Sequence, residues 1–295
     1  MDEAEYISLV EVGPRDGLQS EATTLSIQDK LDLISCLIKA GLRSIQVTSF
    51  VHPKLVDAEA LIQNLPPAPA VSFSALVLNR KGLERALHTN LDCLEISVSA
   101  SSTHSQKNTG MTRQEALENS LPMIEEARSR GFAVRASVQC AFGCAYEGHI
   151  SPDTVMSMAQ VMVQAGANTL ALADTTGMGH PISLSALIPL VLDLAVPVGL
   201  HLHDTLGLGL VNVFTALEHG VRSFDTSCGG MGGCPMIPDA AGNIATEDTI
   251  YFLNTLGYRT GAKWTEVAAC THLLERHLQR TLPAKLRTGG MPPCY

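Results

Sequence analysis

The feature that most constrains the fold is a regular alternation of strand-like and helix-like segments along all 295 residues. Between the strand-like runs, apolar residues recur at helical spacing, as in 26–41 and 151–166. Several helical patterns begin at Ser, Thr or Asp and end just before a glycine, which are typical helix boundaries. The predicted strands are 6–12, 43–50, 70–77, 92–99, 133–140, 168–174, 196–203 and 221–228.

Eight strands that each precede a helix, with no linker between them, predict an α/β protein with a single (β/α)8 TIM barrel over 1–260. Residues 261–295 contain the helical pattern "WTEVAACTHLLERHLQR". We expect an accessory C-terminal helical segment there, packed on the barrel and not a separate domain. The alternative is a doubly wound open sheet, but the first strand–helix turn lacks the GxGxxG pattern of many such folds.

Composition narrows the classes of partner. A hydrophobic content of 45% supports a large core, and a net charge of −9 argues against nucleic acid or an anionic membrane as a partner. No apolar run approaches the ~20 residues that span a bilayer, and the acidic N-terminus does not resemble a signal peptide. The eight cysteines contain no CxxC pair, so we expect reduced thiols in a cytoplasmic protein.

Active sites of TIM barrels lie at the carboxyl ends of the strands, and the stretch "HLHD" stands at such an end. On a strand, residues two apart point the same way, so His201 and His203 project together. An isolated HxH pair is more often two packed or solvated histidines. At the functional end of a barrel strand, the pair is better interpreted as a chelate for a divalent metal.

The stretch "VEVGPRDGLQSE" begins at Val10 and places Arg15 beside Asp16, just after the first predicted strand. Adjacent opposite charges in a loop are usually only solvated. In a closed barrel, however, Asp16 lies near the strand that carries the two histidines. One carboxylate, two imidazoles and an added amide or water oxygen suit Mg²⁺ or Mn²⁺. We therefore interpret Asp16 as a metal ligand and expect Arg15 to face the substrate.

The glycine-rich segment 228–248, "CGGMGGCPMIPDAAGNIATED", follows the last predicted strand. It is either a plain flexible connection or a lid that carries Cys234 over the barrel mouth and delivers Asn243. We favour the lid. Asp174 ends another strand and either caps a turn or supports a metal-binding histidine. Four further candidates for supporting the site or contacting substrate are Gln46, Thr48, Asp204 and Glu247.

Taken together, "EVGPRDGLQSE", "VTSFV", "VSASSTHSQKN", "CAFGCAYEG", "HLHDTLG", "GGMGGCP" and "AGNIATED" resemble the 3-hydroxy-3-methylglutaryl-CoA lyase family. The resemblance covers nearly the whole chain in the right order, and the GGxGGCP loop is its most specific element. It implies a divalent cation, Mg²⁺ or Mn²⁺, bound by Asp16, His201, His203 and Asn243. Arg15 would stabilise an enolate, and Cys234 would act as the lid thiol. His201 or His203 could also relay a proton, although metal binding restricts a histidine in that role.

The implied function is a metal-dependent acyl-CoA lyase that acts on 3-hydroxy-3-methylglutaryl-CoA or a close analogue. It would release acetyl-CoA and a keto acid or ketone, with a CoA thioester as its small-molecule partner and a homodimer as its assembly. Two departures affect the substrate: Gln46 stands where the family usually has Glu, and the loop after His52 is short. The alternatives are a synthase that condenses acetyl-CoA with a 2-oxo acid and a catalytically silent metal-binding paralogue.

Overall fold

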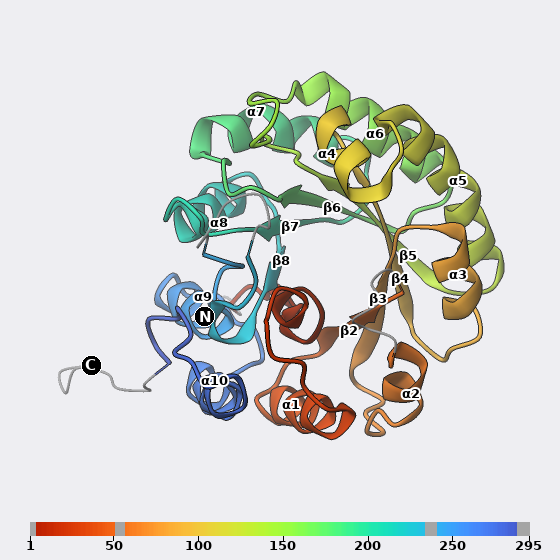
Figure 1. Ribbon diagram of the computed structural model, residues 1–295. Helices are drawn as coiled ribbons and strands as arrows, with labels where there is room; N and C mark the ends of the chain where they lie inside the picture. The colour runs from red at the N-terminus through yellow and green to blue at the C-terminus, as the bar shows by residue number, and fades with distance from the viewer. Residues whose placement is uncertain (1–3, 51–56, 234–240, 288–295) are drawn as a thin grey trace.

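The chain forms a closed barrel of parallel strands in which each strand pairs with the next and β1 pairs with β8 (Figure 1). This computed structural model describes residues 4–50, 57–233 and 241–287. The prediction of a TIM barrel is confirmed, and every predicted strand overlaps an observed one. The strands are β1 (Ser8–Glu11), β2 (Ser44–Ser49), β3 (Ser72–Val77), β4 (Cys93–Ser99), β5 (Ala133–Gln139), β6 (Thr169–Asp174), β7 (Val198–Leu202) and β8 (Ser223–Thr226).

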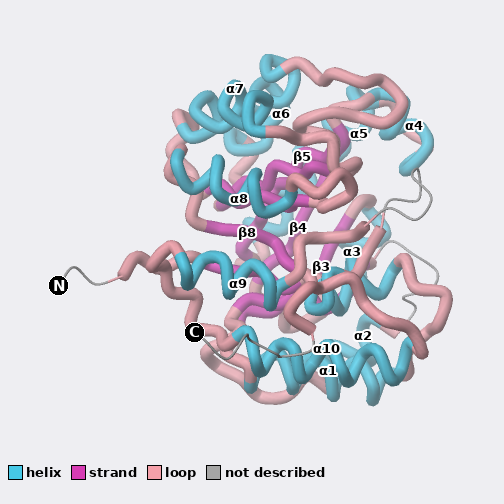
Figure 2. The backbone as a smooth tube through the Cα atoms, turned by 90° about the vertical axis from the view of Figure 1, so that its left-hand side faces the viewer, coloured by secondary structure: helices cyan, strands magenta, loops and turns pink. Residues whose placement is uncertain are grey.

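The helices lie around the outside of the strands (Figure 2). Their ends follow the capping signals of the sequence: Ser26 accepts a hydrogen bond from the Asp29 backbone N–H and so caps α1. Within the described ranges, no helix is both long enough and apolar enough to span a membrane. The helices are α1 (Ile27–Lys39), α2 (Ala58–Gln63), α3 (Arg80–Ala86), α4 (Ser102–Thr109), α5 (Arg113–Ser129), α6 (Pro152–Gln164), α7 (Pro181–Leu192), α8 (Gly209–Glu218), α9 (Thr246–Thr255) and α10 (Trp264–Leu278).

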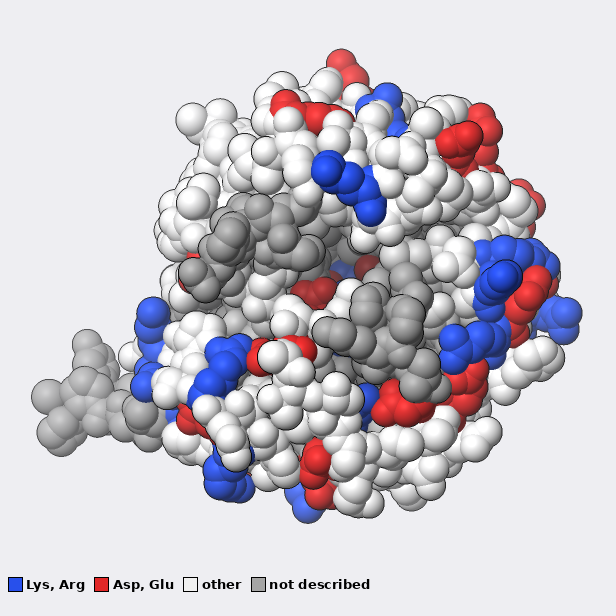
Figure 3. All heavy atoms as spheres, in the orientation of Figure 1, with Lys and Arg blue, Asp and Glu red and all other residues white. Residues whose placement is uncertain are grey.

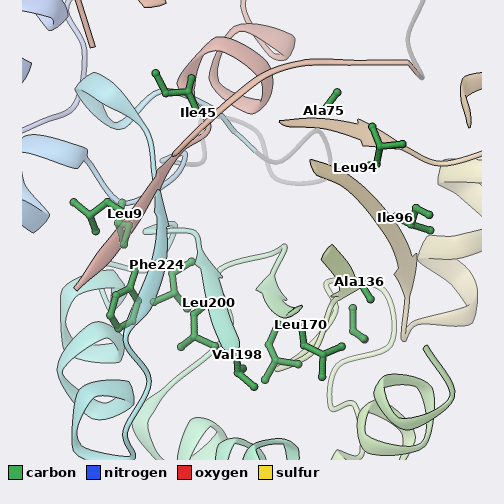
Figure 4. Close-up of a cluster of buried hydrophobic side chains, with 14 of the residues drawn as sticks. Leu9, Ile45, Ala75, Leu94, Ile96, Ala136, Leu170, Val198, Leu200 and Phe224 are labelled. Carbon is green, nitrogen blue, oxygen red and sulfur yellow. The ribbon is translucent and has the colours of Figure 1, made fainter. Parts of the chain in front are cut away.

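The apolar core lies between the strands and the surrounding helices. Alternate residues of a strand point to opposite faces, so each strand can give one apolar face to the helices. On β4, for example, Leu94, Ile96 and Val98 are buried in the hydrophobic cluster. Figure 4 labels members of this cluster from every strand: Leu9, Ile45, Ala75, Leu94, Ile96, Ala136, Leu170, Val198, Leu200 and Phe224.

The opposite faces of the strands place polar and charged groups inside the barrel. Arg135 of β5 hydrogen-bonds Asp225 of β8 at 2.7 Å, although these two strands are not neighbours. The contact therefore crosses the barrel interior. Barrel interiors are more often filled by branched apolar residues, so this interior is organised around charge.

The described part of the C-terminal segment packs against the barrel. Helix α10 lies beside α1 and α9 (Figure 1), and Val267 and Leu274 belong to the same hydrophobic cluster as the barrel. A disulfide joins Cys36 of α1 to Cys270 of α10, with their Cα atoms 5.8 Å apart. The expectation that all cysteines are reduced thiols is therefore wrong for this pair. The two residues lie 234 positions apart in the chain, so sequence spacing gave no sign that they meet.

Candidate active site

A cavity of about 1280 Å³ opens at the carboxyl ends of the barrel strands. Its walls include Arg15, Asp16, Glu95, His201 and His203, which come from three segments distant in the sequence. Figure 3 shows this face of the molecule hollowed at its centre, with acidic and basic side chains visible inside the hollow. Charged groups at this end of a barrel are typical of an active site.

Three side chains in the cavity could hold a metal ion. Asp16, His201 and His203 each offer a ligand atom, and these atoms all lie within 4.8 Å of one another. The Nε2 atoms of the two histidines are 3.1 Å apart. Asp16 Oδ2 lies 3.8 Å from Nε2 of His201 and 3.7 Å from Nε2 of His203. Two imidazole nitrogens and a carboxylate oxygen that converge in this way fit a divalent cation.

A tight turn after β1 brings Arg15 and Asp16 into the cavity. The segment Gly13–Gly17 forms one π-helical turn, with Pro14 near its start. The guanidinium of Arg15 is buried and donates hydrogen bonds to the Asp16 carboxylate and to Gln46 Oε1. These contacts hold the permanently charged guanidinium in one orientation beside the cluster of Asp16, His201 and His203.

Asn243 stands directly against the cluster. Its Nδ2 donates to Asp16 Oδ2 at 2.7 Å, and its Oδ1 is buried with no hydrogen-bond partner among the described residues. Gly232 permits this approach, because a Cβ there would lie 2.6 Å from Asn243 Nδ2 and its φ is +117°. A turn of the amide would offer the unpaired oxygen as a fourth ligand.

The charges within the cluster support one another. Burial alone would raise the pKa of Asp16, but Arg15 and the two histidines hold it well below its usual range. For His201, burial acts to lower the pKa, yet the hydrogen bond to Asp225 and the charge of Asp16 raise it overall. Asp225 Oδ2 lies 3.1 Å from His201 Nδ1. When Nδ1 carries the proton for this bond, Nε2 is left free to face the cluster.

Asp174 and Thr48, both predicted near the site, are buried at the ends of their strands. Asp174 Oδ2 accepts a hydrogen bond from the Gly179 N–H at 2.9 Å, so it caps the turn after β6. Burial raises the pKa of Asp174 to about 6, although the Gly179 bond offsets part of the rise. Asp174 Oδ1, Thr48 Oγ1 and His203 Nδ1 are buried without hydrogen-bond partners in the described part of the chain.

The remaining predicted residues lie further from the cluster. Asp204 accepts from the Gly209 N–H at 2.8 Å and so bonds the first backbone N–H of α8. Glu247 is fully buried and accepts from Thr271 at 2.6 Å and from the Gly229 N–H at 3.0 Å. Neither is among the residues that line the cavity. Cys234 lies outside the described residues, so its role stays a prediction.

Sequence reasoning missed several residues that shape the site. Glu95, Arg135 and Asp225 are buried in the barrel and connect Gln46 to His201. Each is one charged residue within a strand pattern, and its partner stands on another strand, so the contact is not visible in the sequence. His104 also lines the cavity, with its Nδ1 buried and unpaired among the described residues. Burial lowers the pKa of His104.

Glu11 is a further residue without an obvious sequence signal. Its buried carboxylate accepts hydrogen bonds from the Gly13 N–H at 2.8 Å, the Cys228 N–H at 2.9 Å and the Thr246 hydroxyl at 2.7 Å. It thus joins the turn that carries Asp16 to the segments on either side of Asn243. Burial raises the pKa of Glu11 from 4.5 to about 7, against the effect of these three bonds.

A Glu11→Gln substitution should remove a pH-dependent part of the stability. A carboxyl group whose pKa is raised on folding stabilises the protein fully below pH 4.5, and this contribution is lost as the pH rises through about 7. Between those limits, the wild type should lose up to roughly 3 kcal/mol of unfolding free energy relative to Glu11→Gln. Urea unfolding from pH 4.5 to 8 measures the difference. Glu125→Gln, exposed on α5, is the control and should follow the wild type. Parallel profiles for the wild type and Glu11→Gln would show that Glu11 does not titrate in this range.

Comparison with known proteins agrees with this geometry. The HMGL-like family model matches residues 6–274. Hydroxymethylglutaryl-CoA lyase of Pseudomonas mevalonii is 39% identical over 271 residues, which is 89% of each chain. (R)-citramalyl-CoA lyase of Chloroflexus aurantiacus is 37% identical over 307 aligned positions, covering 99% of this chain and 96% of that one.

A solved structure gives the same result at the level of the fold. The HMG-CoA lyase of Acinetobacter baumannii, in complex with coenzyme A and 3-methylmalate, superposes with a TM-score of 0.93 at 34% identity. The match covers 98% of this chain and 97% of that one. The sequence, the barrel and the residues at its mouth therefore lead to one conclusion: the chain belongs to the HMGL-like family of carbon–carbon lyases.

Proposed function

We propose that the protein is a metal-dependent acyl-CoA lyase that splits a 3-hydroxy-3-methylacyl-CoA bearing a free carboxylate, such as 3-hydroxy-3-methylglutaryl-CoA. The observation that carries the proposal is the convergence of Asp16, His201 and His203 beside the buried Arg15. The relatives support it, because the Pseudomonas mevalonii protein is named for this activity. The coenzyme A in the Acinetobacter baumannii structure supports a CoA thioester as the substrate.

The donor set suits Mg²⁺ or Mn²⁺, with Asp16, His201, His203 and Asn243 as the residues that would hold it. The bound cation would fix the substrate hydroxyl and carboxylate and increase the acidity of that hydroxyl. Oδ1 of Asn243 has no hydrogen-bond partner in the described part of the chain and fits this role, since a buried amide oxygen without a partner is costly unless a ligand satisfies it.

The chain's own residues would then manage charge and protons. The reaction starts when the substrate hydroxyl loses its proton. The C2–C3 bond then breaks, the hydroxyl-bearing carbon becomes a carbonyl, and the electron pair of the broken bond forms the enolate of the thioester. Arg15 is permanently cationic and can meet the negative charge that grows on the thioester oxygen. His201 stays the predicted proton relay, a role that it can take only while its Nε2 is not bound to the cation, because its Nδ1 is engaged with Asp225. Cys234 stays the predicted donor that protonates the enolate carbon, so that acetyl-CoA and a keto acid leave.

A second substrate of the same class deserves a direct test. The Chloroflexus aurantiacus relative is named (R)-citramalyl-CoA lyase, and its match spans nearly the whole of both chains. In citramalyl-CoA the carboxylate is attached directly to the hydroxyl-bearing carbon, without the intervening methylene of hydroxymethylglutaryl-CoA. The bond that breaks and the charges that develop are the same. The site geometry therefore suits either compound.

Assays with purified protein and Mg²⁺ or Mn²⁺ distinguish the candidate functions. Each thioester is incubated separately, and acetyl-CoA and the keto acid are followed by mass spectrometry. Equal release of both products from one thioester is the expected result. Condensation of acetyl-CoA with a 2-oxo acid in place of cleavage would identify a synthase. No reaction in either direction would indicate a catalytically silent metal-binding paralogue and would overturn the proposal.

Replacing Asp16 should weaken metal binding without unfolding the barrel. Asp16→Asn keeps the size of the side chain but removes the only carboxylate of the three-residue cluster. We expect Mn²⁺ affinity to fall at least ~10²-fold, since even residues that only support metal ligands cost 10- to 100-fold when replaced. Electron paramagnetic resonance titration measures free Mn²⁺ directly. Asp153→Asn, exposed on α6, serves as the control, and equal affinities for the two variants would remove Asp16 from the ligand set.

Replacing Arg15 should affect catalysis more than binding. Arg15→Met keeps an aliphatic stem but removes the charge that would stabilise the thioester enolate. We expect kcat to fall by ~10²-fold or more, the scale for removing one donor to a developing oxyanion. KM and Mn²⁺ affinity should change little, and the exposed Arg43→Met is the control. A change in KM alone would show that Arg15 only holds the substrate.

We also propose that the protein is a homodimer, while its cytoplasmic location stays a prediction to which the Cys36–Cys270 disulfide runs counter. Apolar side chains are exposed along the neighbouring helices α7 and α8. The exposed fraction is 79% for Ile182, 48% for Val211 and 44% for Phe214. Exposed apolar groups on adjacent helices are typical of an interaction surface. Light scattering after size-exclusion chromatography gives the mass in solution, and a mass of 31.4 kDa would establish a monomer.

A further inference from the structure

A chain of buried hydrogen bonds crosses the barrel and ends on Arg15. Arg15 Nε donates to Gln46 Oε1, and Gln46 Nε2 donates to Glu95 Oε2 at 2.9 Å. The same Glu95 oxygen lies 3.2 Å from Arg135 Nη1. Gln46 is on β2 and Glu95 on β4, which are not neighbouring strands, so their contact lies inside the barrel. Gln46 is fully buried, and Glu95 is 5% exposed.

The amide of Gln46 has one orientation in this chain. Its oxygen faces the guanidinium of Arg15, and its NH2 group faces the carboxylate of Glu95. Only a side chain that both accepts and donates can join a cation to an anion in this way. An ionised carboxylate at position 46 would still accept from Arg15, but it would place a second negative charge against Glu95. Two buried carboxylates this close cannot both ionise without a large cost.

We propose that Gln46 and Glu95 form one positioning unit that holds Arg15 on one side and Arg135 on the other. The unit needs a single negative charge, which can stand at position 46 or at position 95. In this chain the charge resides on Glu95, one side chain removed from Arg15. Among the described residues, Arg15 therefore has one carboxylate partner, Asp16, and its positive charge is less neutralised where the substrate's charge develops.

The Gln and Glu side chains could exchange positions without changing the pattern of hydrogen bonds. With Glu at position 46 and Gln at position 95, the carboxylate at 46 would accept a hydrogen bond from Arg15. The NH2 group of the amide at 95 would donate a hydrogen bond to the carboxylate at 46. The amide oxygen at 95 would face Arg135. The number of hydrogen bonds and the total charge would be unchanged, and only the position of the charge would move. The inference rests on the proposed function for its kinetic test, but not for its stability test.

The experiment is a double-mutant cycle. Glu95→Gln should lower kcat roughly 10- to 100-fold, the scale for a misplaced catalytic group, while KM changes less than kcat. Adding Gln46→Glu to this variant should restore at least about 10-fold of the loss. Gln164→Glu adds the same charge on the exposed surface of α6 and should restore nothing. A double variant no more active than Glu95→Gln alone would overturn the proposal, as would wild-type kcat in Glu95→Gln.

Stability and metal affinity provide readouts that do not depend on turnover. The Tm of the metal-free proteins should show the same rescue, and Mn²⁺ affinity should stay within about 3-fold throughout, because none of the substitutions removes a ligand. If the wild type cleaves no thioester, the proposed function fails, while the Tm cycle still decides the coupling. If the Tm change of the double variant equals the sum of the changes of the two single variants, positions 46 and 95 are not coupled and the proposal is rejected.

A third variant covers the case in which Glu95→Gln does not fold. Gln46→Leu removes both hydrogen bonds of the amide but leaves the Glu95–Arg135 ion pair in place. It should lower kcat by roughly 10-fold or more with little change in Mn²⁺ affinity. Wild-type kcat and KM in Gln46→Leu would show that Arg15 does not need this support, and would overturn the proposal.

Discussion

A buried guanidinium that bridges two carboxylates is the interaction on which the rest of the site depends. Arg135 of β5 lies 3.2 Å from Glu95 on β4 and 2.7 Å from Asp225 on β8. Burial alone would lower the pKa of Arg135, but the two carboxylates raise it above its ordinary value. Breaking such a pair leaves an uncompensated buried charge, at a cost of about 3–5 kcal/mol. The barrel interior is therefore held in one arrangement by charge.

The two carboxylates that Arg135 contacts lead to different parts of the site. Asp225 hydrogen-bonds His201 and directs its Nε2 toward the metal-binding cluster. Glu95 reaches Arg15 through the amide of Gln46. The residues that would bind the cation and the residue that would stabilise the enolate are thus oriented by one network. The apolar layer outside the strands stabilises the barrel, while the polar interior sets the geometry of its mouth.

Much of the fold and part of the site could be predicted from the sequence. Each predicted strand overlaps an observed one because strand and helix periods are local properties of the chain. His201 and His203 were found because residues two apart on a strand share a face, and Asp16 because parallel strands end at one face of a barrel. The prediction failed for Cys36 and Cys270, whose pairing joins helices from opposite ends of the chain.

The sequence by itself determined the barrel, the face that carries the chemistry and three converging candidate ligands, since all of these follow from local patterns. Only the tertiary structure decided which buried charges meet, because contacts across a closed barrel depend on strand register and on where polar groups can find partners away from water. Gln46 shows the difference. In the sequence it appears only as a lost carboxylate. In the structure its NH2 group lies 2.9 Å from Glu95, so the negative charge is supplied by another strand.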